Sequence, residues 1–288
     1  MTGKLTTLVA EPWDDWGLID CGNGRKLERY GPVTVARPEP QAMWPPALDR
    51  WGPDATFVPG SDEEGGGRWE RHRDVPPQWE LSRGAVRFNA SLTPFRHLGF
   101  FPDMAPQWDW MSKRAADADL LNLFGYTGVG TLFLSEAGGR LVHVDASKKS
   151  VEQGKENAKL SGLADRPIRW IVDDAGKFTA REVRRDRRYD GILLDPPKFG
   201  RGPNGEVWRL EESLAPLLAD CRQLLDEQSR FLVLTVYAVR MSALAIGELV
   251  ERTLGDLGGK VEMGEMAVRE ESRGLLLPTA IFARWSRS

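Results

Sequence analysis

The segment Asp195-Pro196-Pro197-Lys198-Phe199 combines one carboxylate, two prolines and an aromatic ring within five residues. Consecutive prolines fix the backbone and remove two N–H donors, so the segment offers mainly carbonyl and carboxylate oxygens. These oxygens can accept hydrogen bonds from a planar amino group, and the Phe199 ring can stack on the base that carries it. A plain strand exit would explain the prolines but not the flanking Asp195 and Phe199. The segment therefore indicates a binding site for a planar, amino-bearing ligand.

A glycine-rich turn lies upstream, at Phe124-Gly125-Tyr126-Thr127-Gly128-Val129-Gly130. Glycines allow a sharp turn and a close approach to a ligand. The dinucleotide fingerprint would need glycine at position 127, which is Thr; starting the pattern at Gly128 places Phe133 at its last position. The turn is consistent with a ligand that lacks phosphates, and also with a plain tight turn.

Acidic residues follow two further apolar runs. Asp145 lies twenty residues after Gly125, a spacing at which a carboxylate accepts hydrogen bonds from ribose hydroxyls. Asp173 and Asp174 come after the next run, where one can accept from an adenine amino group and either can cap a helix. Of these two, we expect Asp174 to contact adenine.

The elements that would position these residues alternate from about residue 118 onward. Apolar runs predict strands at 120–124, 141–144, 168–172, 189–194, 230–236, 261–268 and 279–285. Helices are predicted between them at 131–137, 147–160, 175–185, 210–225 and 242–254. This order predicts an α/β fold, a doubly wound sheet with helices on both faces and ligands beyond the carboxyl ends of its strands.

Residues 1–110 differ in composition, because they hold eight of the eleven tryptophans and many prolines. They predict a small, loop-rich β region, with an exposed loop at 61–67 and strand-like alternation at 79–92. The tryptophans can stack on bases, but we expect most of them to be structural. The predicted domains are therefore residues 1–110, on the substrate side and as a lid over the ligand site, and residues 111–288.

The composition limits the classes of ligand. The net charge of −3 does not predict a polyanion-binding protein, so any contact with nucleic acid needs a local basic face. The arginine-rich residues 181–188 precede the fourth strand, at the opposite edge, and are expected to be a solvated turn. Cysteines and histidines show no metal-ligand spacing, so no metal is expected. No secretory signal or membrane span is evident, which favours a cytoplasmic location.

Residues 122–128, 144–147 and 195–199 together resemble the class I S-adenosylmethionine (SAM)-dependent methyltransferases. They are most similar to the bacterial large-subunit ribosomal RNA methyltransferases that modify cytosine C5 or guanine N7. The resemblance covers about residues 80–288 and implies a Rossmann-like, seven-stranded sheet ending in an antiparallel hairpin, with SAM as cofactor and RNA as partner. The cofactor residues are then Phe101, Gln107, Phe124, Gly125, Tyr126, Thr127, Gly128, Asp145, Ala146, Ser147, Asp173, Asp174 and Asp195.

In this interpretation Asp195 and the Pro196 carbonyl orient the acceptor base, and Phe199 stacks on it beside Pro197. Lys198 contacts a phosphate or is solvated, and Tyr237 lines the base pocket. Methylation at cytosine C5 needs a cysteine nucleophile, and no cysteine lies at these strand ends. A base nitrogen is therefore the expected methyl acceptor.

Other functions are compatible with parts of the pattern. A methyltransferase of protein or of a small molecule would share the cofactor site. A non-enzymatic RNA-binding protein with a relic of this fold would not bind SAM. A nicotinamide oxidoreductase would also place an acid after its second strand, but it needs the phosphate fingerprint that is missing here. The oligomeric state is left open.

Overall fold

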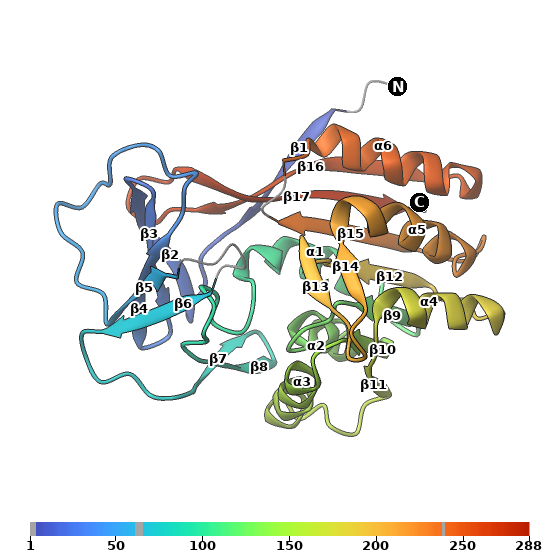
Figure 1. Cartoon of the computed structure of the whole chain (residues 1–288), viewed down its shortest axis with the longest axis horizontal. Helices are drawn as coiled ribbons and strands as arrows, with labels where there is room; N and C mark the ends of the chain where they lie inside the picture. The colour runs from blue at the N-terminus through green and yellow to red at the C-terminus, as the bar shows by residue number, and fades with distance from the viewer. Residues whose placement is uncertain (1–3, 61–65, 238–239, 288) are drawn as a thin grey trace. The chain divides into compact units, whose positions relative to one another are not determined.

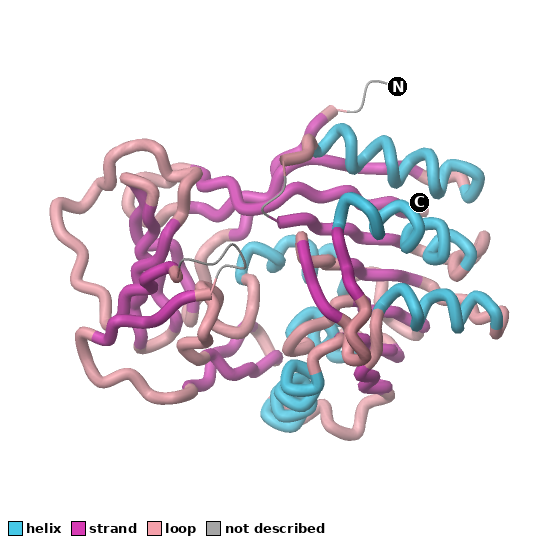
Figure 2. Tube along the Cα trace, in the orientation of Figure 1, coloured by secondary structure: helices cyan, strands magenta, loops and turns pink. Residues whose placement is uncertain are grey.

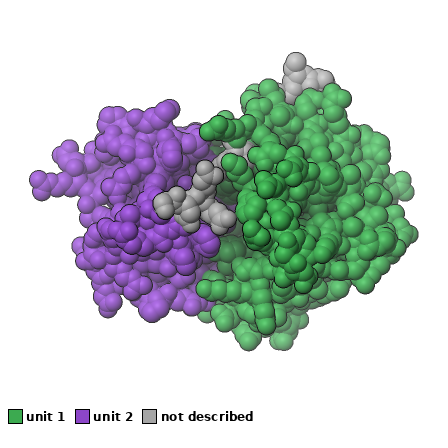
Figure 3. Space-filling view, in the orientation of Figure 1, with its two compact units in different colours: residues 1–8, 105–266, 280–288 green, residues 9–104, 267–279 purple. Residues whose placement is uncertain are grey.

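The computed structural model of the protein describes residues 4–60, 66–237 and 240–287. Two compact units form the chain: unit 1 comprises residues 1–8, 105–266 and 280–288, and unit 2 comprises residues 9–104 and 267–279 (Figure 3). The sequence predicts a single boundary near residue 110. The two units differ from that division at two segments. Residues 1–8 belong to unit 1 although they precede the boundary, and residues 267–279 belong to unit 2 although they follow it.

Unit 1 contains an eight-stranded sheet with the order β1-β16-β17-β15-β12-β9-β10-β11. Five of its strands are parallel: β9 (Asp119–Leu123), β10 (Arg140–Asp145), β11 (Ile168–Val172), β12 (Gly191–Leu194) and β15 (Phe231–Tyr237). β17 (Leu276–Ser286) runs antiparallel to β15 and follows β16 (Lys260–Arg269) after a short turn. The predicted parallel sheet with a terminal hairpin is confirmed.

The number of strands differs from the expectation, because the resemblance implied seven and the sheet has eight. The additional strand is β1 (Leu5–Ala10), which pairs with β16 at the edge of the sheet. An edge strand leaves a row of backbone N–H and C=O groups without partners, and β1 satisfies the row on β16. Nothing local to residues 5–10 identifies a strand more than 250 residues away as their partner.

Helices cover both faces of this sheet (Figures 1 and 2). One face carries α1 (Ala105–Ser112), α2 (Val129–Glu136) and α3 (Lys148–Leu160), and the other carries α4 (Ala175–Arg184), α5 (Leu210–Gln223) and α6 (Ala243–Leu254). Strand residues such as Ile192 and Leu194 pack with Phe178, Leu217 and Val250 in the core beneath α4 to α6. The helices after residue 129 match the predictions to within two residues at each end, whereas α1 was not predicted.

Unit 2 contains a five-stranded sheet with the order β2-β3-β4-β5-β6 and a separate β7–β8 hairpin. The strands are β2 (Trp16–Gly22), β3 (Arg25–Tyr30), β4 (Val33–Pro38), β5 (Ala55–Pro59), β6 (Gly67–Arg71), β7 (Trp79–Arg83) and β8 (Val86–Ala90). Trp16 and Trp79 are buried within it, which agrees with a structural role for them. Of the expected loop, residues 61–65 lie outside the described residues, and Gly67 already begins β6.

Candidate active site

The glycine-rich turn, residues 124–128, connects β9 to α2 at the carboxyl edge of the parallel strands. Phe124, Tyr126 and Gly128 have φ angles of 57°, 48° and 78°. Glycine adopts such angles freely, whereas Phe and Tyr do so only when their surroundings impose it. Hydrogen bonds from Gly125 N to the Val144 carbonyl and from Gly128 N to the Gly125 carbonyl, both 3.0 Å, close the turn. Imposed positive φ angles favour a functional turn over a plain one.

Asp145, at the end of β10, holds this turn from the neighbouring strand. One carboxylate oxygen accepts from Tyr126 N and the other from Ser147 N, each at 2.8 Å. Burial raises the pKa of Asp145, and the two backbone N–H donors partly oppose that rise. Each oxygen has a further lone pair, so the carboxylate can still accept a hydrogen bond from a ligand hydroxyl. The predicted contact with ribose stays a prediction, as do those of Ala146 and Ser147.

A buried histidine explains Gly125 in a way that the sequence did not predict. A Cβ atom at Gly125 would lie 2.4 Å from the ring of His143, so only glycine fits there. His143 Nδ1 is 2.9 Å from Thr131 Oγ1, which accepts from Asn122 Nδ2 at 2.9 Å. Burial lowers the pKa of His143 to about 3, so the ring is neutral. The glycine is therefore required by packing beneath the turn.

A second contact missing from the sequence analysis comes from α3. Asn157 is buried, and its Nδ2 donates to the Thr127 carbonyl at 3.0 Å. The turn is thus held from β10 by Asp145 and from α3 by Asn157. No local signal marks Asn157, because its partner lies thirty residues earlier.

Asp173 and Asp174 follow β11 at the same edge. The Asp174 side chain accepts from Lys177 N at 2.9 Å and caps α4, as the alternative interpretation held. Asp173 accepts from Asp174 N at 2.9 Å and pairs with Arg181 Nη2 at 2.6 Å. The structure therefore accounts for both carboxylates within the protein, and the contact of Asp174 with adenine stays a prediction.

Segment 195–199 leaves the end of β12, between the ends of β9 and β15. Asp195 is half-buried and Pro196 buried, whereas Pro197, Lys198 and Phe199 are exposed. The segment leads directly into a hairpin of β13 (Phe199–Arg201) and β14 (Val207–Arg209), which the sequence analysis did not predict. An Asn-Gly pair at 204–205 is a typical hairpin signal, but strands of three residues are too short to show alternation.

Trp208, on β14, joins the two motifs. Its Nε1 donates to the Pro197 carbonyl at 2.7 Å, and its ring lies 4.8 Å from that of Phe124 in an edge-to-face arrangement. The indole is buried. One side chain therefore fixes both the proline segment and the start of the glycine-rich turn.

Phe199 is more exposed than the buried Trp208, because 39% of its surface is accessible to solvent. The guanidinium carbons of Arg201 and Arg209 lie 6.0 Å and 5.9 Å from its ring centroid. Both distances are within the range of cation–π attraction. The hairpin thus presents a partly exposed aromatic side chain with two cations near its ring, four residues after Asp195.

The other predicted contacts lie in several places. Gln107, on α1, is fully buried, and its side-chain oxygen accepts from Arg284 Nη1 at 3.2 Å. Tyr237 ends β15, at the same edge as Asp195. Phe101 belongs to unit 2, where its ring lies 5.3 Å from that of His97. Contacts of Phe101 and Gln107 with the cofactor, and of Tyr237 with a base, stay predictions.

Both cysteines are buried, and neither belongs to the segments at the strand ends. Cys221 is part of the core beneath α5, and Cys21 lies in β2 with its Sγ 3.3 Å from Glu270 Oε1. Burial raises the pKa of both thiols, that of Cys21 to about 12. Neither is available as a thiolate nucleophile at neutral pH. In the part of the chain that the structure describes, no three His, Cys, Asp or Glu side chains group as metal ligands, and no helix could cross a membrane.

Known proteins are similar to this chain in sequence and in fold. The family described as S-adenosylmethionine-dependent methyltransferase matches residues 68–225, more than half of the 288-residue chain. A SAM-dependent methyltransferase of Agrobacterium tumefaciens, solved by crystallography, is 43% identical; the match covers 100% of this chain and 97% of that one, with a TM-score of 0.93.

Two further relatives are named as ribosomal RNA enzymes. Ribosomal RNA large subunit methyltransferase I of Aeromonas salmonicida is 31% identical over 51% of this chain and 34% of its own length. Ribosomal RNA large subunit methyltransferase K/L of Magnetococcus marinus is 31% identical over 51% of this chain and 20% of its own length. The chain thus spans about a third or less of these curated relatives. With the strained turn, Asp145 and the family match in agreement, the chain belongs to the S-adenosylmethionine-dependent methyltransferases.

Proposed function

We propose that this methyltransferase acts on RNA and methylates a nitrogen atom of a base, with ribosomal RNA as the first substrate to test. The observation that carries the proposal is the β13–β14 hairpin, which holds the exposed Phe199 ring between Arg201 and Arg209. A base can stack on such a ring while the arginines contact neighbouring phosphates. The names of the Aeromonas and Magnetococcus relatives support the same class of substrate.

The cofactor site fits SAM on structural grounds. The imposed turn at 124–128 brings backbone to the edge of the sheet, and Asp145 offers a half-buried carboxylate there for ribose hydroxyls. SAM, when bound, supplies a methyl group already activated by its sulfonium. The residues of this chain then have to hold the acceptor in line and exclude water. We assign the orientation of the acceptor to Asp195 and the Pro196 carbonyl, and the stacking to Phe199.

A nitrogen acceptor follows from the state of the cysteines. Carbon C5 of cytosine becomes nucleophilic only after a thiolate adds to C6. The chain has two cysteines, and both are buried with raised pKa values. A base nitrogen with a lone pair needs no such activation. The proposal also includes the cytoplasmic location expected from the sequence.

The test is methyl transfer from isotopically labelled SAM to total RNA and, separately, to total protein and small metabolites. RNA is then digested to nucleosides, and the methylated base is identified by mass spectrometry. We expect label on a ring or exocyclic nitrogen of one base. Label on C5 of cytosine would overturn the nitrogen assignment. Label confined to protein or metabolites would select another methyl acceptor, and RNA binding without SAM binding would indicate a non-enzymatic protein.

A further inference from the structure

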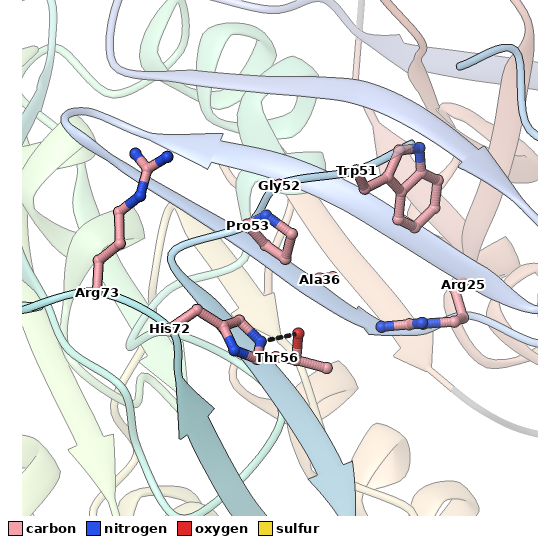
Figure 4. Close-up of a pocket in the computed structure, with 8 residues that line it drawn as sticks. All are labelled: Arg25, Ala36, Trp51, Gly52, Pro53, Thr56, His72 and Arg73. Carbon is pink, nitrogen blue, oxygen red and sulfur yellow. Dashed lines mark hydrogen bonds between the residues drawn. The ribbon is translucent and has the colours of Figure 1, made fainter. Parts of the chain in front are cut away.

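Unit 2 contains a cavity of about 450 Å³ that no step of the proposed methyl transfer uses. Figure 4 shows its walls, which include Arg25, Trp51, Thr56, His72 and Arg73. Every one of these residues lies within 9–104, so the cavity is complete in one unit. Its volume is within the range of small-ligand sites.

The floor of the cavity is one face of the five-stranded sheet. Residues directly opposite each other on paired strands point to the same face. The register pairs Leu27 with Ala36 and Ala36 with Thr56, so all three share a face with Arg25, two residues before Leu27. Trp51, Gly52 and Pro53, on the loop before β5, form a further wall of the cavity (Figure 4).

The indole of Trp51, which forms the aromatic wall of the cavity, is held by a hydrogen-bond network around a buried carboxylate. Trp51 Nε1 donates to Asp20 Oδ2 at 2.8 Å. Asp20 is fully buried and also accepts from the backbone N–H groups of Ala47 and Leu48, at 3.0 Å and 2.8 Å. Burial alone would raise the pKa of Asp20, but these donors keep it below its ordinary value, so the carboxylate is charged and a strong acceptor. The Trp51 ring is therefore fixed before any ligand arrives.

The cavity is lined by cations and by no acidic side chain. Arg25 is exposed, its guanidinium carbon lies 6.0 Å from the Trp51 ring centroid, and none of the described carboxylates pairs with it. His72 Nε2 is 2.9 Å from Thr56 Oγ1, and the His72 ring and the Thr56 hydroxyl face the same space as Arg25 (Figure 4). Arg73 pairs with Asp54 at 3.3 Å and remains 73% exposed. An anionic group with an attached planar ring matches this lining.

We propose that this cavity binds one nucleotide of a single-stranded RNA, with a phosphate on Arg25 and the base against Trp51. The inference rests on the proposed RNA substrate and adds a contact site in unit 2 to the one at the β13–β14 hairpin. An acidic peptide would satisfy Arg25 but would leave the fixed indole face without a planar partner. A nucleotide uses both.

The experiment measures binding of a fluorescein-labelled single-stranded oligouridylate to the full chain by anisotropy, over a series of salt concentrations. Arg25→Ala is compared with Arg68→Ala, which removes the same charge from exposed β6 of the same unit outside the cavity. We expect Arg25→Ala to weaken binding roughly tenfold and to reduce the slope of log K against log salt by about 0.7, the value for one phosphate contact on a single strand. Arg68→Ala should stay within twofold of the parent.

Methyl transfer to total RNA by the parent is measured in parallel, so that the two proposals can fail separately. Equal affinities for Arg25→Ala and Arg68→Ala would overturn the cavity site, even if the parent methylates RNA. No binding of oligouridylate by the parent would overturn it as well. Binding that depends on Arg25 without methylated RNA would support the cavity and contradict the proposed function. Uridine 5′-monophosphate bound as tightly as the oligomer would show that the ligand is a free nucleotide and overturn the RNA assignment.

Discussion

Asp145 and His143 lie two residues apart on β10, on the same face of the strand, and both support the glycine-rich turn. Asp145 binds the turn through Tyr126 N, and His143 packs against Gly125. Asp145 is a half-buried carboxylate at the site, whereas His143 is a neutral ring buried in the core. Their variants should therefore differ, the first affecting cofactor binding and the second affecting stability.

Asp145→Ala should weaken binding of S-adenosylhomocysteine by roughly 10- to 150-fold, because a hydrogen bond to a charged acceptor contributes about 1.5–3 kcal/mol. Calorimetric titration measures the dissociation constant. Asp165→Ala, which removes an exposed carboxylate before the amino end of β11, should bind like the parent. Equal affinities of the two variants would remove Asp145 from the cofactor site.

His143 should make the protein less stable as the pH falls. Its folded-state pKa of about 3 is below the ordinary 6.5, so the unfolded chain takes up the proton first and stability declines from pH 6.5 toward pH 3. His143→Gln should be less stable than the parent at pH 7.5, and the gap should narrow by about 1.4 kcal/mol at pH 5.5. Urea unfolding at both pH values tests this. A gap that does not change with pH would mean that His143 is not buried as a neutral ring.

At the scale of elements, the β13–β14 hairpin determines how segment 195–199 is presented. The antiparallel pair places Phe199 opposite Arg209, and Trp208 fastens the hairpin to Pro197. The hairpin is also tied to α4 by an ion pair between Lys177 and Glu206. The roles of the exposed Phe199 and of the buried Trp208 can therefore be tested separately.

Phe199→Ala should reduce methyl transfer at least tenfold while affinity for S-adenosylhomocysteine stays within a few-fold, because the ring holds the acceptor and not the cofactor. The matched control is Val207→Ala, an equally apolar and 52% exposed residue of the same hairpin. Single-turnover methylation and calorimetry give both quantities. Loss of cofactor binding in Phe199→Ala would place this segment in the cofactor site instead.

Trp208→Phe keeps an aromatic ring near Phe124 but removes the donor to the Pro197 carbonyl. We expect kcat to fall several-fold, because the proline segment is no longer fixed. Trp285→Phe removes a similar bond, from its Nε1 to the Gly258 carbonyl at 2.6 Å, at the amino end of β15, and should lower stability without lowering kcat. Equal kcat values in both variants, measured below their unfolding temperatures, would show that Trp208 acts only on stability.

At the scale of the whole molecule, the two units divide the RNA contacts that we propose. Unit 1 holds the cofactor turn and the hairpin, and unit 2 holds the cationic cavity. Each unit also buries one of the two cysteines, Cys221 in unit 1 and Cys21 in unit 2. The chemistry of methyl transfer should therefore be independent of thiols in either unit.

The double variant Cys21→Ala, Cys221→Ala should retain the kcat of the parent within about threefold, and no covalent complex with RNA should form. Methylation kinetics and denaturing electrophoresis measure the two outcomes. Circular dichroism verifies that the variant is folded. A folded but inactive variant, together with a covalent RNA complex in the parent, would contradict nitrogen methylation.

Much of unit 1 could be predicted from the sequence, because the signals involved are local. The order of the sheet strands β9, β10, β11, β12, β15, β16 and β17, the boundaries of α2 to α6 and the acids after β10 and β11 follow from hydrophobic period and turn residues. Parallel strands then bring their carboxyl ends to one edge without further information. Asp145 was predicted at the site for this reason.

The tertiary structure determined the contacts between residues that are distant in sequence. β1 pairs with β16, Asn157 holds Thr127, and Trp208 contacts both Phe124 and Pro197. The cavity of unit 2 likewise combines three strands with two loop segments, and residues 267–279 join that unit from the far end of the chain. The sequence by itself determined which elements form and which motifs end them, because those depend on neighbours within a few residues. Only folding determined which side chains meet, because burial and hydrogen bonding select partners by distance in space.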